Sequence, residues 1–197
     1  MSSAGDGGVV RVRLDLGYDG GGFAGWARQP GQRTVQGVLE EALGRILRAE
    51  VGLTVAGRTD AGVHATGQVA HADVPAGAWA GLAPTLVRRL AGVLPADVRV
   101  RAVAPASAGF DARFSALLRR YAYRVSDAPH GADPLRRHDT LAWPRPLDPA
   151  GLRAAAAGLL GEHDFAAYCR HRPGATTVRR LLRLDWQRGT EIGRAHV

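Results

Sequence analysis

An aspartate and an arginine lie two residues apart in a glycine-bracketed turn, and together they could support nucleophilic chemistry. The stretch runs Gly57-Arg58-Thr59-Asp60-Ala61-Gly62, after a short apolar run and before an alternating one. Glycine at both ends favours a sharp turn or a close approach to the backbone. From spacing alone two interpretations stay open. Asp60 can cap its own turn, as aspartates in turns commonly do, or it can be an attacking carboxylate held by a nearby guanidinium.

The elements around this turn predict a small sandwich of a sheet and helices. Apolar residues alternate with charged ones over 10–16, flank the turn, and alternate again over 98–104, which indicates strands. Thr34 is a helix cap followed by an amphipathic stretch to Leu47, and a second helix is predicted over 79–91. The order strand, helix, strand, strand, helix, strand predicts an α+β sandwich of the ferredoxin-like type over 9–105, with both helices on one face.

The rest of the chain restarts a similar pattern, so we expect a second α+β half over 106–191. Tyr121 and Tyr123 alternate with arginines in a predicted strand ending at Val125. Asp148 followed by Pro149 is a typical helix start, and 176–187 reads as a further strand. Residues 1–8 are polar and glycine-rich, which predicts a disordered tail.

Charge points to a polyanionic partner. The net charge is +8 with a sequence pI near 11.0, which suggests RNA or DNA before a membrane. All 26 basic residues are Arg, and codon bias explains the preference for Arg over Lys but not the excess of base over acid. A single cysteine, Cys169, excludes an internal disulfide and fits a reducing cytoplasm. No apolar run approaches the ~20 residues that a membrane-spanning helix needs.

A loop rich in glycine and aromatic residues follows the first strand. It carries Phe23, Trp26, Arg28 and Arg33. Such side chains can contact RNA by stacking on bases and by pairing with phosphates. The alternative is that an aromatic residue is buried and the arginines are solvated, and the sequence leaves both interpretations open.

Three stretches resemble one enzyme family. The turn and the strand after it read GRTDAGVHATGQVAH, which resembles the signature of the TruA-type tRNA pseudouridine synthases. Two further stretches resemble that family's opening and second motifs, YDGGGFAGWARQPGQRTVQG and RFSA…RRYAYR. The resemblance implies the pseudouridine synthase fold, with two ferredoxin-like or RRM-like halves, the second incomplete here. It implies that Asp60 is the nucleophile, that Tyr121 lies against the target base, and that Arg58 holds a phosphate or fills the vacated stack.

The same resemblance implies the reaction and its setting. A family member converts uridine to pseudouridine in the tRNA anticodon stem-loop (positions 38, 39 and 40). It needs no cofactor and no metal, takes tRNA as its partner, is a homodimer at full length, and is cytoplasmic.

Two other functions are compatible with parts of this sequence. A non-catalytic RNA-binding module of the same shape would explain the charge but would not require the GRTDAG turn. A metal-dependent hydrolase could use Asp60, His64, His71 and Asp73, yet no pair follows the H-E-x-x-H spacing.

The end of the chain departs from the family pattern. Residues 192–197 correspond to one reading frame of a common sequencing adapter, so we expect Ile192 to Val197 to be foreign to the natural protein. On that expectation roughly the last quarter to third of the enzyme is absent, judged by ordinary domain sizes. The absent part would hold the Arg that pairs with the catalytic Asp and an apolar residue that packs on the base.

Overall fold

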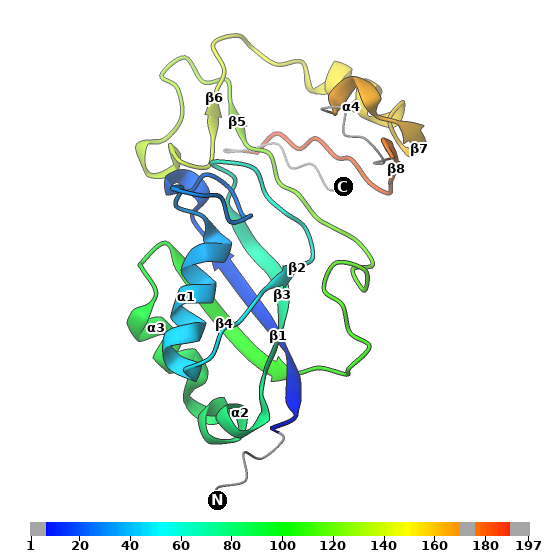
Figure 1. Cartoon of the computed structure of the whole chain (residues 1–197). Helices are drawn as coiled ribbons and strands as arrows, with labels where there is room; N and C mark the ends of the chain where they lie inside the picture. The colour runs from blue at the N-terminus through cyan, green and yellow to red at the C-terminus, as the bar shows by residue number, and fades with distance from the viewer. Residues whose placement is uncertain (1–6, 170–175, 190–197) are drawn as a thin grey trace, which may run out of the picture. The chain divides into compact units, whose positions relative to one another are not determined.

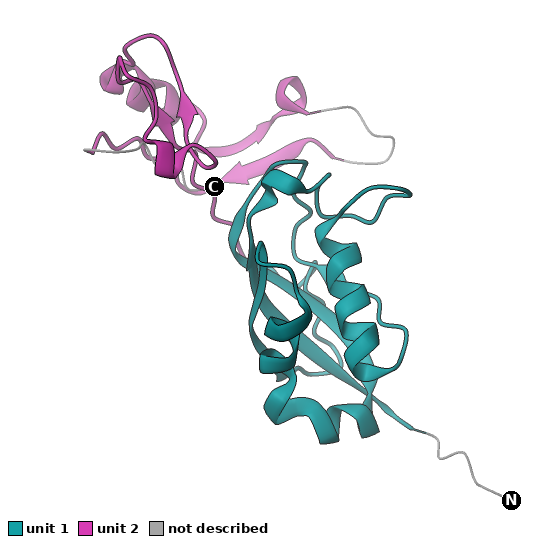
Figure 2. Ribbon diagram, turned by 90° about the vertical axis from the view of Figure 1, so that its left-hand side faces the viewer, with its two compact units in different colours: residues 1–116 teal, residues 117–197 magenta. Residues whose placement is uncertain are grey.

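The computed structural model describes residues 7–169 and 176–189. The chain forms two compact units, Met1–Ala116 and Leu117–Val197, coloured separately in Figure 2. The predicted tail at 1–8 lies mostly outside the described residues, and the expected foreign segment 192–197 lies wholly outside them.

Unit 1 is built on a four-stranded antiparallel sheet. Its strands are β1 (Val9–Tyr18), β2 (Thr54–Val55), β3 (Ala65–Pro75) and β4 (Val98–Pro105), in the order β2-β3-β1-β4. The long strand β1 lies in the middle and pairs with both β3 and β4. The predicted α+β class and the predicted order of elements are confirmed, and the sheet order is that of a ferredoxin-like sandwich.

The helices of unit 1 cover one face of this sheet (Figure 1). They are α1 (Val35–Leu47), α2 (Ala76–Leu82) and α3 (Leu86–Val93), with short 3-10 turns at Gly20–Gly22 and Ala83–Thr85. Thr34 caps α1 as predicted, because its hydroxyl accepts from the backbone N–H of Gly37. Alternate β1 side chains pack against buried leucines of α1 and α3; the largest members of this core are Leu14, Leu16, Leu39, Leu43, Leu86 and Leu90.

The prediction of one continuous helix over 79–91 is wrong. Two helices occupy this region, separated by the 3-10 turn Ala83–Thr85. The physical reason is Pro84, which has no backbone N–H to donate and whose ring clashes with the preceding helical turn.

The open face of the sheet is polar and carries the segment that leaves unit 1. Arg11 forms a bidentate ion pair with Asp73 and also donates to the carbonyls of Ala108 and Phe110. The buried ring of His71 accepts the backbone N–H of Ala112 through Nδ1 at 3.0 Å. Because of these contacts the compact unit extends to 116, beyond the 105/106 boundary expected from the sequence.

Unit 2 has shorter elements. Strands β5 (Val125–Ser126) and β6 (Leu141–Ala142) form a parallel pair, and β7 (Gly161–Asp164) and β8 (Val178–Leu181) form an antiparallel pair. The remaining elements are α4 (Pro149–Ala157) and 3-10 turns at Pro134–Arg136 and Ala166–Tyr168. Asp148 caps α4 as predicted, accepting from the N–H groups of Ala150 and Gly151.

Two strand predictions in unit 2 fail in length. The strand expected over 119–125 is reduced to Val125–Ser126, and the one expected over 176–187 is reduced to Val178–Leu181. A strand needs a neighbour to pair its backbone groups, and within the described residues no strand lies alongside 117–123. Tyr121 and Tyr123 are therefore half exposed rather than packed in a core.

Candidate active site around Asp60

Asp60 lies on the loop that joins β2 to β3 at one end of the sheet of unit 1. Its side chain is exposed, and so is that of Arg58 on the same loop. The turn closes through the N–H of Val63, which donates to the carbonyl of Asp60 at 3.2 Å. Gly62 has φ +79°, a conformation that favours glycine, so the second bracketing glycine is needed by the turn itself.

A second loop, between β1 and α1, holds the Asp60 loop from outside. The N–H of Trp26 donates to the carbonyl of Thr59 at 2.9 Å, and the N–H of Gly62 donates to that of Phe23 at 3.3 Å. Gly25 has φ +104°, and a Cβ there would lie 2.9 Å from the carbonyl oxygen of Thr59. The two loops are so close that only glycine fits at this position.

A buried chain of hydrogen bonds holds the Asp60 loop from inside. The hydroxyls of Tyr18 and Thr59 lie 2.8 Å apart. Gln68 Nε2 donates to the Tyr18 hydroxyl at 3.2 Å and to the carbonyl of Gly57 at 2.8 Å. Tyr18 and Gln68 are both buried, so these contacts tie the two residues that flank Arg58 to strands β1 and β3.

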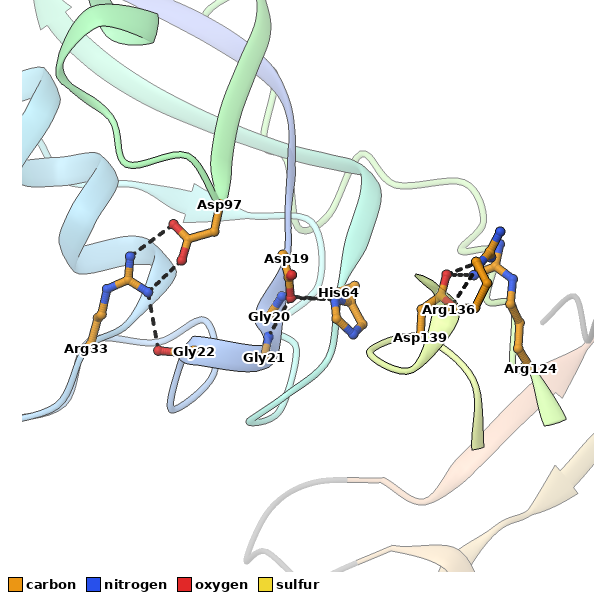
Figure 3. A network of polar contacts seen from close by, with 10 residues as sticks. All are labelled: Asp19, Gly20, Gly21, Gly22, Arg33, His64, Asp97, Arg124, Arg136 and Asp139. Atoms are coloured by element: carbon orange, nitrogen blue, oxygen red, sulfur yellow. Dashed lines mark hydrogen bonds and ion pairs between the residues drawn. The ribbon is translucent and has the colours of Figure 1, made fainter. Parts of the chain in front are cut away.

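His64 ends the loop and binds the 3-10 turn after β1 (Figure 3). Its Nδ1 lies 2.9 Å from Asp19 Oδ1 and 3.2 Å from the backbone nitrogen of Gly20. With a proton on Nδ1 the ring donates to the carboxylate, and without one it accepts the Gly20 N–H. The Asp19 carboxylate also accepts the N–H of Gly21, so this corner of the loop is held by several polar contacts.

Most of the residues considered for a metal site have other partners. His64 contacts Asp19, His71 accepts from Ala112, and Asp73 pairs with Arg11. Among the described residues, no three side chains of metal-binding type come together.

The aromatic residues expected as possible RNA contacts are structural. Phe23 and Trp26 are buried, the latter only 1% exposed, and both belong to the core of unit 1. Arg33 lies over the Phe23 ring at 4.0 Å and forms a bidentate ion pair with Asp97, which holds the pKa of that carboxyl below its usual value (Figure 3). The buried interpretation left open by the sequence is therefore the right one for Phe23 and Trp26, whereas Arg28 remains largely exposed.

The three predicted site residues fall in two places. Arg58 and Asp60 share one loop in unit 1, and within the described residues neither side chain has a hydrogen bond or an ion pair. Tyr121 belongs to unit 2, where the residue is 51% exposed. An exposed carboxylate and a guanidinium on a firmly held loop can act on a ligand without first breaking an internal contact.

Sequence reasoning missed Tyr18 and Gln68. Tyr18 lies on the same face of β1 as Leu14 and Leu16, and Gln68 lies on the same face of β3 as Ala70 and Ala72. A polar group at the end of an apolar strand face was the signal that pointed to them. Only the fold, however, shows that both reach the same loop.

Comparison with known proteins identifies the family. No protein-family model matches the chain. A tRNA pseudouridine synthase A of Frankia casuarinae is 66% identical over 185 residues, which cover 93% of this chain and 66% of that protein. Proteins of the same name from Streptomyces griseus and Mycobacterium leprae are 59% and 53% identical and cover 98% and 95% of this chain, with 69% of each relative matched.

The matched region thus spans about two thirds of the length of these curated relatives. The similarity extends over nearly the whole chain, including the Asp60 loop and the loop that holds it. Identity at this level over this coverage shows that the chain belongs to the tRNA pseudouridine synthase A family.

Proposed function

We propose that this protein isomerises uridine to pseudouridine in the anticodon stem-loop of tRNA, with Asp60 as the nucleophile. The observation that supports this most is the Asp60 loop, which presents an exposed carboxylate, unpaired among the described residues, on a backbone held by hydrogen bonds from β1, β3 and the loop after β1. Names of relatives at 53–66% identity support the reaction class. A binding module without catalysis would not need an exposed carboxylate on so firmly held a backbone.

The chemistry requires rearrangement within one nucleotide. The C1′–N1 bond breaks, the base turns in the pocket, a C1′–C5 bond forms, C5 loses its proton and N1 gains one. Substrate and product are isomers, so the net reaction needs no oxidant, group donor or cofactor. The target nucleotide has to leave its stack to reach the carboxylate, as in other enzymes that act on a base.

Each site residue has a part in this proposal. Asp60 acts on the sugar of the flipped nucleotide. Arg58, exposed two residues away, binds a backbone phosphate or fills the space that the base has left. Tyr121 supplies an exposed ring that lies against the target base.

The wider setting belongs to the same proposal. Arginines outside the pocket give affinity for tRNA phosphates, in keeping with the net charge of +8. The described residues include no helix that is long and apolar enough to cross a membrane. We place the enzyme in the cytoplasm, as a homodimer at full length.

Replacing Asp60 with Asn tests the proposal. In the full-length enzyme, Asp60→Asn should abolish isomerisation and leave tRNA affinity within a few-fold, because one carboxylate does the chemistry while many arginines bind. The matched control is Glu41→Gln, an exposed carboxylate on α1, which should keep full activity. Turnover by Asp60→Asn would remove Asp60 from the nucleophile role, and loss of tRNA binding with turnover per bound tRNA unchanged would assign it to recognition.

A further inference from the structure

Beneath the Asp60 loop, the partners of Gln68 fix the orientation of its side-chain amide. The carbonyl of Gly57 can only accept, so the Gln68 amide nitrogen must face it, at 2.8 Å. The second hydrogen of that amide then points to the Tyr18 hydroxyl, and Gln68 Oε1 accepts the N–H of Val69. The Tyr18 hydroxyl accepts from Gln68 and also lies 2.8 Å from Thr59 Oγ1, where either hydroxyl can donate to the other.

This chain fixes the residues just before Asp60. Gly57 is held by Gln68, and Thr59 is held twice, through its hydroxyl by Tyr18 and through its carbonyl by the N–H of Trp26. Rotation of the backbone at Thr59 would swing Asp60, which follows it directly. Both anchoring side chains rise from the central strands β1 and β3, the best-supported part of the sheet.

The position of these polar groups favours a functional over a purely structural role. The face of β1 that packs on the helices is apolar at Val12, Leu14 and Leu16 and becomes polar only at Tyr18. The same face of β3 is apolar at Ala70, Ala72 and Val74 and becomes polar only at Gln68. Buried polar groups cost desolvation that apolar side chains of similar size avoid. On this helix-packed face the cost is incurred only at the end of the sheet that carries Asp60.

We propose that Tyr18 and Gln68 are positioning residues that hold the backbone of residues 57–60 and thereby aim the Asp60 carboxylate at its target. The proposal rests on the proposed function for its effect on catalysis, but its effect on the loop is independent of that function. Neither side chain touches the reacting atoms in this account. They act through Gly57 and Thr59.

The main test is Tyr18→Phe in the full-length enzyme, which keeps the ring against Trp26 and removes only the hydroxyl. We expect kcat to fall by roughly 10- to 100-fold, because a misplacement of about 1 Å can cost that much, while KM for tRNA stays within about 2-fold. Thr34→Ala is the matched control, since it removes another buried hydroxyl in unit 1, at the cap of α1. It should lower thermal stability with kcat unchanged.

A double-mutant cycle shows whether the effect passes through Thr59. Thr59→Val removes the hydroxyl that Tyr18 binds and keeps the side-chain shape. If one hydrogen bond carries both effects, Tyr18→Phe combined with Thr59→Val should lose no more than the worse single variant. The proposal would be overturned if the losses in kcat of the two single variants multiply in the double variant. An unchanged kcat in Tyr18→Phe, or a raised KM with normal kcat, would also overturn it.

Amide hydrogen exchange gives a readout without activity. In Tyr18→Phe the N–H groups of Trp26 and Val63, which bind the carbonyls of Thr59 and Asp60, should exchange faster, while that of Val38 in α1 should not change. Unchanged exchange at Trp26 and Val63 would overturn the proposal even if the wild-type chain does not isomerise uridine. Absence of isomerisation by the full-length wild-type enzyme, or turnover by its Asp60→Asn variant, would count against the proposed function alone.

Discussion

The two units present their candidate site residues on very different supports. In unit 1, Asp60 is exposed, but its loop is bonded to β1, to β3 and to the loop after β1. In unit 2, Tyr121 is also exposed, but the residues around it, 117–123, belong to no strand in the described structure. Exposure alone therefore says little about a site residue. What distinguishes the two is how far the backbone beneath each is fixed.

The same contrast extends to the cores. Unit 1 has one continuous cluster of buried apolar side chains drawn from the sheet and from α1 and α3. In the described part of unit 2, the buried apolar residues are Ala156 and Leu181. Burial of apolar surface is the main source of folding free energy, so unit 1 should carry most of the stability of the chain.

Truncation of one leucine in each unit, buried in unit 1 and exposed in unit 2, should give the largest difference. Leu43→Ala removes a buried α1 side chain and should lower the free energy of unfolding by about 2–5 kcal/mol. Leu182 is 61% exposed, and Leu182→Ala should stay within about 0.5 kcal/mol. Urea denaturation of both variants checks this. Equal losses would mean that unit 2 has a core which the described residues do not show.

Substitution of two positive-φ glycines should give a smaller effect. Gly25 in unit 1 has φ +104° and a close neighbour, whereas Gly131 in unit 2 has φ +86° and open space around it. Strained backbone of this kind costs about 1–3 kcal/mol. Gly25→Ala should lower the free energy of unfolding by more than this strain, because the Thr59 carbonyl must also move. Gly131→Ala should lower it by the backbone strain alone. Thermal unfolding gives the stabilities, and equal losses would contradict the close contact.

The pH dependence of stability should differ between the units by the smallest margin. Burial and the nearby Arg11 lower the pKa of His71 from 6.5. The unfolded chain therefore binds a proton on His71 at higher pH than the folded chain does. The stability that neutral His71 contributes is complete above about pH 6.5 and is lost as the pH falls through the lower pKa of the folded state. Asp111 and Asp73 also face the ring, and their attraction for a charged His71 opposes this shift but does not outweigh it.

In unit 2 the corresponding groups are carboxylates. Hydrogen bonds from Arg188, Arg136 and Thr177 lower the pKa values of Asp127, Asp139 and Asp164 below 3.8. The stability that these three carboxylates contribute to the fold is lost only as the pH falls below about 3.8. Hydrogen exchange between pH 7 and 5 should therefore show loosening around Ala112 in unit 1, and His71→Gln should abolish the change. Loosening that persists in His71→Gln would exclude His71 as its source.

Much of unit 1 follows from the sequence because its signals are local. Periodicity located α1 and the long strands, and Thr34 was recognisable as a cap. The break at Pro84 was also accessible, since proline rarely occupies a helix interior. The Asp60 loop was recognised by its motif, but its supports were not, because Tyr18 and Gln68 meet Thr59 and Gly57 only after β1 and β3 pair.

Unit 2 was less predictable for a related reason. Alternation of Tyr121 and Tyr123 describes which face a side chain would take if a strand formed, yet a strand also needs a partner.

In unit 1, the sequence could not decide whether Phe23 and Trp26 are buried. An aromatic residue in a glycine-rich loop is equally suited to packing in a core and to stacking on a base.

The close fit of the two loops has a consequence for when the site appears during folding. The contacts between Tyr18 and Thr59 and between Gly20 and His64 join residues 41 and 44 positions apart. Contacts of such separation form slowly, since the entropy of closing the intervening chain is lost before they contribute. A partly folded chain, even one with α1 already formed, would hold Asp60 on a free segment. The Asp60 site should therefore form only when β1 and β3 pair, late in folding and in a single step. No early folding intermediate could then act on an RNA that it met.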